Sequence, residues 1–186
     1  MKKNLILLVA CLWVGATGTG GRERPPVRRP TAPPVASSIA FSIRNAGFPV
    51  AGTLGGVRAD IAFDPDHLAG SRMVATADPA TLRTGIGIRD KHLQRPDYFD
   101  VVRHPQVRLV STAFRKTGKN AFVGEFALTI KGVTKPVTLP FTRSRRGSVT
   151  TYRGQFQLDR LDFNLGETSA VLDRQVTVSV VAQVEE

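Results

Sequence analysis

The sequence contains little of what catalytic, metal-binding and disulfide-stabilised proteins depend on. Its 186 residues include one cysteine, Cys11, one tryptophan and three histidines. One cysteine excludes an internal disulfide and any zinc site built from several cysteines. His67, His92 and His104 lack metal-ligand spacing such as H-x-x-x-H, and no G-x-S-x-G nucleophile motif occurs. We therefore expect a protein without catalytic residues, metal or cofactor.

The chain also lacks an apolar run long enough to span a bilayer. Its longest, residues 5–14, follows Lys2 and Lys3 and leads into small residues that end at Gly18. A charged start, a short apolar segment and small residues are typical of an export signal, so we expect residues 1–18 to be removed and the protein to be periplasmic or secreted. Residues 8–11 also resemble a lipobox, in which Cys11 would carry a lipid anchor. Since only six apolar residues precede Cys11, we favour cleavage after Gly18.

Acidic residues are scarce: 15 Asp and Glu stand against 26 Lys and Arg, a net charge of +11. Four of the arginines lie in residues 19–37, a Pro- and Arg-rich stretch without apolar periodicity that we expect to be a disordered linker. The remaining domain, residues 38–186, has 20 basic and 14 acidic residues. This excess is smaller than in dedicated nucleic-acid binders, and stacking aromatics do not accompany the basic residues. No nucleic-acid partner is therefore expected.

What the sequence does have is alternation of apolar and polar residues, clearest over residues 121–141. Apolar side chains recur at every second position up to a turn at residues 132–136, after which the alternation resumes. Successive side chains of a strand point to opposite faces, so this stretch predicts a β-hairpin with one buried face. That face would carry Phe122, Phe126, Leu128, Ile130, Val137, Leu139 and Phe141.

The same pattern predicts further strands around this hairpin. Residues 50–63 are expected to form one long strand, bent at Gly52, Gly55 and Gly56 as barrel closure requires. Residues 79–105 break the alternation and predict a short helical insertion, with turns at 79–82 and 89–94, between the third and fourth strands. The eight expected strands are residues 38–43, 50–63, 72–78, 106–115, 121–131, 136–143, 149–158 and 176–180.

Eight antiparallel strands joined mostly by short loops favour an all-β, up-and-down barrel, which has no free edges. An open sandwich of two sheets is the alternative. The interior of an eight-stranded barrel can either be filled by side chains or hold one small ligand. The inward residues of this sequence are compatible with both alternatives. The candidate lumen and ligand-binding residues are Phe41, Ile61, Phe63, Met73, Leu109, Phe126, Leu128, Leu139, Phe156, Phe163 and Val178.

Two motifs, in this order, resemble the YceI-like family of exported bacterial proteins. Residues 83–112, RTGIGIRDKHLQRPDYFDVVRHPQVRLVST, are similar to one family signature, and residues 124–141, GEFALTIKGVTKPVTLPF, to its signature hairpin. The resemblance extends from about residue 38 to the C-terminus. It implies a lipocalin-like barrel that sequesters a long isoprenoid-type lipid in its lumen, for transport or storage, without catalysis.

Arg89, Asp90 and His92 are the strongest candidates for acid–base chemistry. A working base needs a nucleophile or a metal within hydrogen-bond reach, and the sequence offers neither. We favour a structural role instead, in which Arg89 and Asp90 pin the helical insertion onto the barrel.

Basic residues cluster in two loops. An up-and-down strand order places both loops at one end of the barrel and the helical insertion at the other end, where the insertion would act as a lid. The loop after the fourth strand carries Arg115 and Lys116, and the loop after the sixth carries Arg143, Arg145 and Arg146. This rim is either a solvated charged surface or a peripheral contact with an anionic membrane, to which each cation would contribute about 1 kcal/mol. A packed-core barrel that docks by this rim, on a membrane or a protein partner, is the alternative to lipid binding.

Overall fold

Nine strands make up most of the protein. The computed structural model describes residues 37–185, so the predicted export signal, Cys11 and nearly all of the predicted linker lie outside the described residues. In chain order the strands are β1 (Ser37–Asn45), β2 (Phe48–Leu54), β3 (Arg58–Ala62), β4 (Arg72–Ala77), β5 (Val107–Lys116), β6 (Ala121–Ile130), β7 (Val133–Arg146), β8 (Val149–Asp159) and β9 (Gln175–Glu185).

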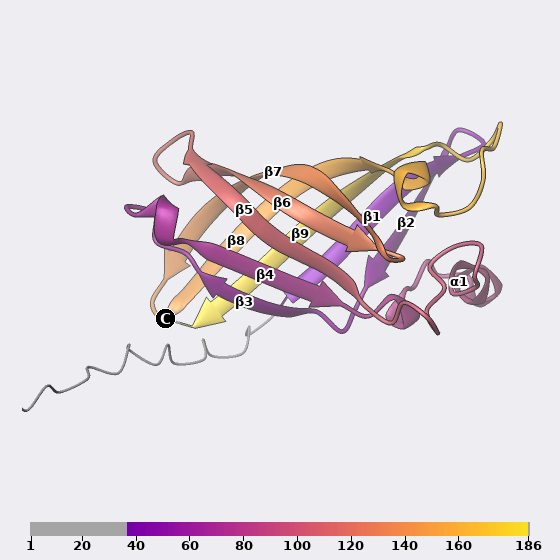
Figure 1. Cartoon of the computed structure of the whole chain (residues 1–186), viewed down its shortest axis with the longest axis horizontal. Coiled ribbons are helices and arrows are strands. Elements are labelled where there is room, and N and C mark those ends of the chain that lie inside the picture. The colour runs from indigo at the N-terminus through magenta and orange to yellow at the C-terminus, as the bar shows by residue number, and fades with distance from the viewer. Residues whose placement is uncertain (1–36, 186) are drawn as a thin grey trace, which may run out of the picture.

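All nine strands belong to one antiparallel sheet. Their order across the sheet is β2-β1-β9-β8-β7-β6-β5-β4-β3. The sheet curves into a half-barrel (Figure 1). The all-β, antiparallel class predicted from the alternation is therefore confirmed, and a sandwich of two sheets is excluded.

β6 and β7 form the hairpin expected at residues 121–141. The two strands pair without interruption along the whole of β6. Lys131 and Gly132 connect them with φ angles of 49° and 75°, and a two-residue turn with both residues at positive φ matches the twist of the strands. Val137 of the predicted buried face is only half-buried, whereas the other six residues are buried as predicted: Phe122, Phe126, Leu128, Ile130, Leu139 and Phe141.

The predicted strand at residues 50–63 is in fact two strands, so the predicted count of eight is wrong. β2 and β3 lie at opposite edges of the sheet. Inward side chains are even-numbered in β2 and odd-numbered in β3, as Leu54 and Ile61 illustrate. Because inward residues of a regular strand recur at every second position, this change of parity requires a break. Gly56, with φ of 61°, lies in that break.

The edges of β2 and β3 do not pair with each other, so the hydrogen-bonded ladder does not close as predicted. The segment after β4 instead covers part of β2. Thr53 and Arg83 exchange backbone hydrogen bonds of 2.8 and 3.0 Å, and the Asp78 amide donates to the Gly55 carbonyl at 3.1 Å. These bonds satisfy part of an edge that would otherwise be free to pair with another chain.

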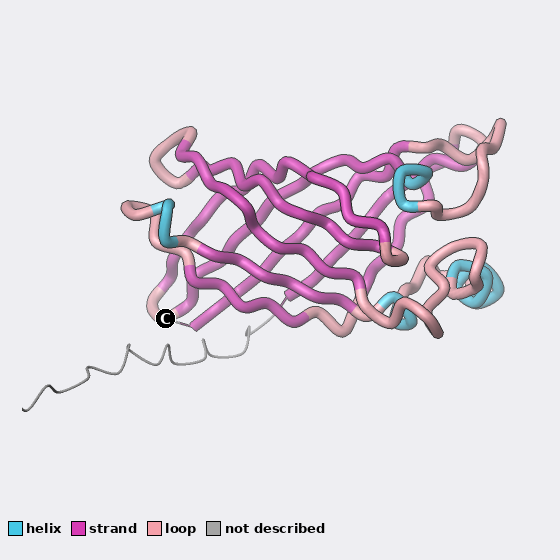
Figure 2. Tube along the Cα trace, viewed as in Figure 1, coloured by secondary structure: helices cyan, strands magenta, loops and turns pink. Residues whose placement is uncertain are grey.

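Helical segments are short and lie beyond the strand ends (Figure 2). Two of them, η2 (Pro79–Thr81) and α1 (Gly87–Leu93), lie between β4 and β5, where the sequence predicted an insertion. The sequence did not predict η1 (Leu68–Gly70) or η3 (Arg160–Phe163). Within residues 37–185, no helix is both long and apolar enough to cross a membrane.

The half-barrel has a rim end and a lid end. The rim end carries the β5–β6 turn, the β7–β8 turn and residues 63–71. The lid end carries the insertion, residues 78–106, together with the β1–β2 turn, the β6–β7 turn and residues 160–174 (Figure 1). The insertion packs on the β6–β7 turn, because the His104 ring lies 3.1 Å from where a side chain on Gly132 would begin. This layout agrees with the predicted opposition of a basic rim and a lid.

Candidate functional site

A cavity of about 310 Å³ lies on the concave side of the sheet, at the lower end of the range of about 300–1,000 Å³ for ligand pockets. All nine strands contribute side chains to its walls. Its lining includes most of the predicted lumen residues: Phe41, Ile61, Met73, Leu109, Phe126, Leu128, Leu139, Phe156 and Val178. Their role in binding a ligand stays a prediction.

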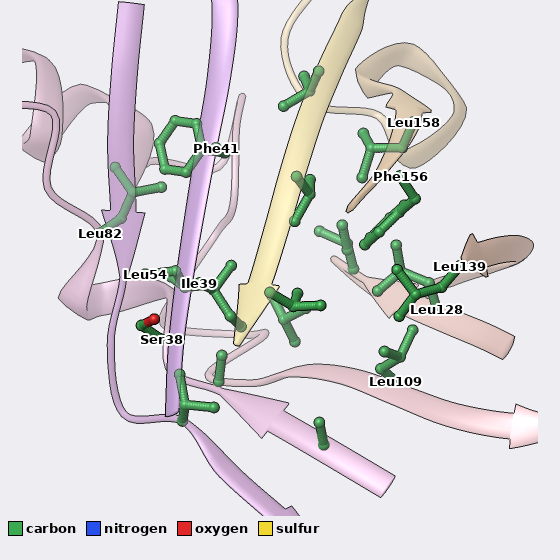
Figure 3. Close-up of a pocket in the computed structure, with 18 of the residues that line it drawn as sticks. Ser38, Ile39, Phe41, Leu54, Leu82, Leu109, Leu128, Leu139, Phe156 and Leu158 are labelled. Atoms are coloured by element: carbon green, nitrogen blue, oxygen red, sulfur yellow. The ribbon is translucent and has the colours of Figure 1, made fainter. Parts of the chain in front are cut away.

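Opposite walls of the sheet face each other across this cavity. Figure 3 shows Phe41 and Leu54 on one wall and Leu139 and Phe156 on the other. The Phe41 ring lies against Gly52 of β2, where a Cβ atom would be 2.3 Å from the end of the ring. Phe41 can occupy this part of the wall because Gly52 has no side chain.

An aromatic cluster closes the cavity at the rim end. Phe63 is at its centre, with the ring centroids of the four other members 5.0–5.8 Å away, all edge to face. Such pairs contribute about 0.5–1.5 kcal/mol each beyond the burial of their area. Phe141 and Tyr152 also line the cavity, so this cluster forms its floor. We call it the aromatic plug: Phe63, Phe114, Phe122, Phe141 and Tyr152.

Two predicted lumen residues, Phe63 and Phe163, are not part of the cavity lining. Phe63 follows the end of β3, and its ring is enclosed by the other rings of the plug. Phe163 lies on η3, outside the predicted strands, and is buried in the hydrophobic core instead of facing the cavity. The sequence did not decide between a core filled by side chains and a hollow lumen, and the structure contains both. The half-barrel is packed at the rim end and hollow towards the lid end.

Residues of the lid end complete the walls of the cavity. The sequence pattern did not predict that these residues line it. They come from the insertion and from the β8–β9 connection. The two segments are joined by the Gly166 amide, which donates to the Asp97 carbonyl at 2.8 Å. Neither segment has regular strand structure, so the two-residue period says nothing about which of its apolar side chains face inward. The apolar lining residues from these segments are Leu82, Leu93, Phe99, Leu165 and Leu172.

Arg89 and Asp90 both bind Thr84 rather than each other. The Asp90 carboxylate accepts from the Thr84 hydroxyl at 2.5 Å and from its amide at 2.8 Å. Arg89 donates to the same hydroxyl at 2.7 Å and to the Thr84 carbonyl at 2.8 Å. The bond from the Thr84 hydroxyl is the main reason that the pKa of Asp90 lies below its ordinary value of 3.8, although burial opposes the shift. Asp90 is therefore suited to anchor the insertion and poorly suited to donate or accept protons near neutral pH.

Arg160 anchors the other half of the lid end. It is buried, and it donates from Nη1 to the Leu165 carbonyl (2.7 Å), from Nη2 to the Glu167 carbonyl (2.7 Å) and from Nε to the Asp173 carbonyl (3.0 Å). Buried charged groups require such partners, because an unsatisfied one is costly. One side chain thus holds most of the connection from η3 to β9.

Polar residues of the cavity lining lie mainly at the lid end. Ser38, Thr76, Tyr152 and Arg153 are the exceptions, since they lie on strands. His92 pairs with Asp97, which is not part of the cavity lining: its Nε2 atom lies 3.4 Å from a carboxylate oxygen of Asp97. Within residues 37–185, His, Cys, Asp and Glu side chains do not gather in a group that could hold a metal ion. The polar lining residues of the lid end are Thr84, Arg89, His92, Tyr98 and Arg160.

The predicted basic rim lies outside this cavity. The structure places its residues on the rim-end halves of β5 and β7: Arg115, Lys116, Arg143, Arg145 and Arg146. Lys116 approaches Asp66 at 3.8 Å, and both side chains are exposed. Exposed pairs of this kind contribute about 0–1 kcal/mol. The aromatic plug separates these cations from the cavity, so they do not contribute to its lining.

Comparison with known families matches residues 31–184 to the YceI-like domain. The chain belongs to the YceI-like family. Among curated relatives, a UPF0312 protein of Pseudomonas syringae pv. tomato is 30% identical over 149 residues, which cover 75% of this chain and 78% of the relative. Protein YceI of Escherichia coli O17:K52:H18 is 29% identical over 161 residues, covering 78% of this YceI-like chain and 81% of the relative.

Solved structures share the fold of this YceI-like chain. BcnA of Burkholderia cenocepacia superimposes with a TM-score of 0.76 at 26% identity, covering 80% of this chain and 96% of BcnA. A polyisoprenoid binding domain from Saccharophagus degradans, implicated in plant cell wall breakdown, superimposes with a TM-score of 0.66, covering 84% of this chain and 99% of that domain. Its identity of 13% shows a common fold alone.

Proposed function

We propose that this YceI-like protein is exported and holds one long-chain, isoprenoid-type lipid in its cavity, for transport or storage. The observation that carries the proposal is a cavity walled by apolar side chains from all nine strands and floored by aromatic rings. Transfer of a long apolar chain from water into such a space gains about 0.8 kcal/mol per buried methylene. A protein whose whole core were packed would have no such space.

The shape of the lining supports a methyl-branched chain. Four small side chains, those of Ala59, Ala75, Ala77 and Ala182, lie among the bulky wall residues and leave width beside the axis of the bound chain. Met73, which has three rotatable bonds and a polarisable sulfur, can adapt to an irregular ligand. The common fold with the Saccharophagus degradans polyisoprenoid binding domain adds support for this class of ligand.

The distribution of polar lining residues gives the lipid an orientation. Thr84, Arg89, His92, Tyr98 and Arg160 lie at the lid end, whereas the plug at the rim end is aromatic. A polar head group pairs best with hydrogen-bond donors, and an apolar tail pairs best with rings. The tail therefore extends towards the aromatic plug, and the head group lies beneath the insertion.

Export is supported by the sequence, in which Lys2 and Lys3 precede the apolar residues 5–14 and small residues follow. The mass of the protein purified from its native host tests it. A mature chain that begins at residue 19 is expected, and a lipid-modified chain that begins at Cys11 would identify an anchored form instead. A chain that retains Met1 would contradict export by this signal.

Native mass spectrometry tests the lipid directly. The protein is purified without detergent and measured before and after extraction with organic solvent, and the extracted protein is then offered a synthetic polyprenol. We expect an added mass that solvent removes, followed by uptake of one polyprenol per chain. A protein that is free of lipid when purified and takes up no polyprenol would reject the proposal and favour the packed-core alternative.

A further inference from the structure

Large apolar side chains that remain exposed gather at one end of the molecule. Among residues 37–185, every exposed large apolar side chain belongs to the lid end, in the insertion, at the start of β2 or in the β8–β9 connection. Ile88 is 83% exposed and Val102 is 90% exposed, so neither has any role in the core. The full set, called here the apolar tips, is Phe48, Ile86, Ile88, Val102 and Val171.

The apolar tips surround the part of the cavity that the lid-end residues line. Ile88 precedes Arg89 on α1, and Val171 precedes Leu172; both Arg89 and Leu172 line the cavity. Val171 also accepts the Ala46 amide at 2.6 Å, which places it beside the β1–β2 turn that Phe48 follows. α1 and the β1–β2 turn project from the same end of the half-barrel (Figure 1). The tips therefore occur on both sides of the lid end.

Exposed cations accompany the apolar tips. Arg44, Arg83, Lys91, Arg95 and Arg103 are exposed at the lid end. Of the four carboxylates in the insertion, Asp90 and Asp100 are buried in hydrogen bonds, Asp78 is half-buried and accepts from the Ala80 amide, and Asp97 is exposed. The exposed surface of the insertion is consequently basic as well as apolar. Apolar side chains combined with cations match an anionic lipid bilayer, in which both an apolar interior and negative head groups are available.

We propose that the lid end docks on an anionic membrane surface, with the apolar tips in the head-group region and the cations against lipid phosphates. This inference deepens the proposed function, on which it rests in one respect: docking at the lid end, towards which the cavity extends, would let the lipid pass between membrane and cavity without crossing water. The rim end cannot serve this purpose, because the aromatic plug fills it. The membrane contact predicted for the basic rim would place the closed end of the cavity on the bilayer.

Vesicle co-sedimentation of four proteins tests the proposal, with vesicles of phosphatidylcholine alone or mixed with phosphatidylglycerol. The lid apolar variant carries Phe48→Ser, Ile88→Ser and Val102→Ser. Two charge variants are matched, since each removes three cations. The lid charge variant carries Arg44→Gln, Arg83→Gln and Lys91→Gln, and the rim charge variant carries Arg143→Gln, Arg145→Gln and Arg146→Gln.

Wild-type protein is expected to bind the mixed vesicles and to bind them less in high salt. The lid apolar variant should bind at least tenfold more weakly, and the lid charge variant should lose more binding than the rim charge variant. The substituted lid side chains are exposed, and Arg83→Gln removes a hydrogen bond to the neighbouring Leu82 carbonyl, so thermal unfolding should change little, which separates lost docking from lost folding.

Several results would overturn the proposal. These are absence of wild-type binding, unchanged binding by the lid apolar variant, or a larger loss in the rim charge variant. A wild-type dimer that the lid apolar variant dissociates would assign the apolar tips to a second copy of the chain. Polyprenol uptake in solution is measured on the same samples. Uptake without vesicle binding rejects the docking surface alone, whereas vesicle binding without uptake rejects the proposed lipid-carrying function.

Discussion

At the residue scale, two buried polar side chains position the lid end over the cavity. Arg160 holds the β8–β9 connection through three backbone carbonyls, and Asp90 holds the insertion through Thr84. Neither arrangement follows from the sequence pattern. Arg160 binds three backbone carbonyls, and Asp90 binds the amide and the hydroxyl of Thr84, and the positions of all these groups depend on the fold. The sequence predicted that Arg89 and Asp90 pin the insertion onto the barrel, but both side chains bind Thr84, which belongs to the insertion itself.

Replacement of Arg160 by methionine should destabilise the protein. The variant leaves the buried Leu165 carbonyl without a donor, which costs about 1–3 kcal/mol, with further loss from the carbonyls of Glu167 and Asp173. Urea unfolding measures the change. Arg174→Gln is the matched control, since Arg174 is exposed and pairs with Asp159 at 2.7 Å. Its cost should be about 1 kcal/mol or less, and an equal cost for both variants would contradict the assigned role of Arg160.

The effect of Asp90→Asn should depend on pH. The pKa of Asp90 in the folded protein is lower than its ordinary value of 3.8 because the carboxylate accepts the Thr84 hydroxyl. A carboxyl of this kind stabilises the fold above its unfolded pKa, and this stability is lost as the pH falls through the folded value. The variant should therefore melt below wild type near pH 6, and the two melting temperatures should converge below pH 3.8. A difference that is constant with pH would contradict this account.

At the element scale, the alternation predicted where strands lie but not where they end or break. β7 extends beyond its predicted end through Arg145 and Arg146, because its ladder with β8 is made by backbone groups whatever the side chains are. β9 continues to Glu185 for the same reason. The sequence contains a signal for the split between β2 and β3. Within residues 50–63, the inward apolar residues are even-numbered up to Leu54 and odd-numbered from Val57 onwards. Glycines alone predict a bend, whereas the change of parity distinguishes a break from a bend.

Gly56→Ala should be more costly than Gly147→Ala. Both glycines have positive φ, 61° and 58°, where a Cβ atom costs about 1–2 kcal/mol. A Cβ atom on Gly56 would also lie 2.7 Å from the Asp78 Cβ atom, whereas nothing lies within 4 Å of one on Gly147. The additional clash occurs where the segment after β4 covers the sheet edge. Equal free energies of unfolding for the two variants would show that this junction is not tightly packed.

At the scale of the whole molecule, the two ends of the half-barrel differ in a way that the sequence revealed only in part. Strand order was enough to place the basic rim opposite the insertion. It could not show that Phe63 and its neighbours fill the rim end, since the two-residue period identifies an inward face but not how many side chains meet there. Nor could it identify the lining residues of the lid end, because Leu93 and Leu172 lie outside the strands. The strand walls were therefore predictable, whereas the floor and the lid-end lining were not.

The central claim is that the cavity itself holds the lipid, and a matched pair of variants tests it. Ala75 lines the cavity on β4, whereas Ala40 of β1 points outward and is exposed. Ala75→Phe fills the space that the lipid would occupy, and Ala40→Phe adds the same ring to the outer surface. The measurement is polyprenol bound per chain, by native mass spectrometry, for wild type and both variants. We expect one polyprenol bound by wild type and by Ala40→Phe, and at least tenfold weaker binding by Ala75→Phe with its fold intact. Equal binding by all three proteins would place the lipid outside the cavity and contradict the account.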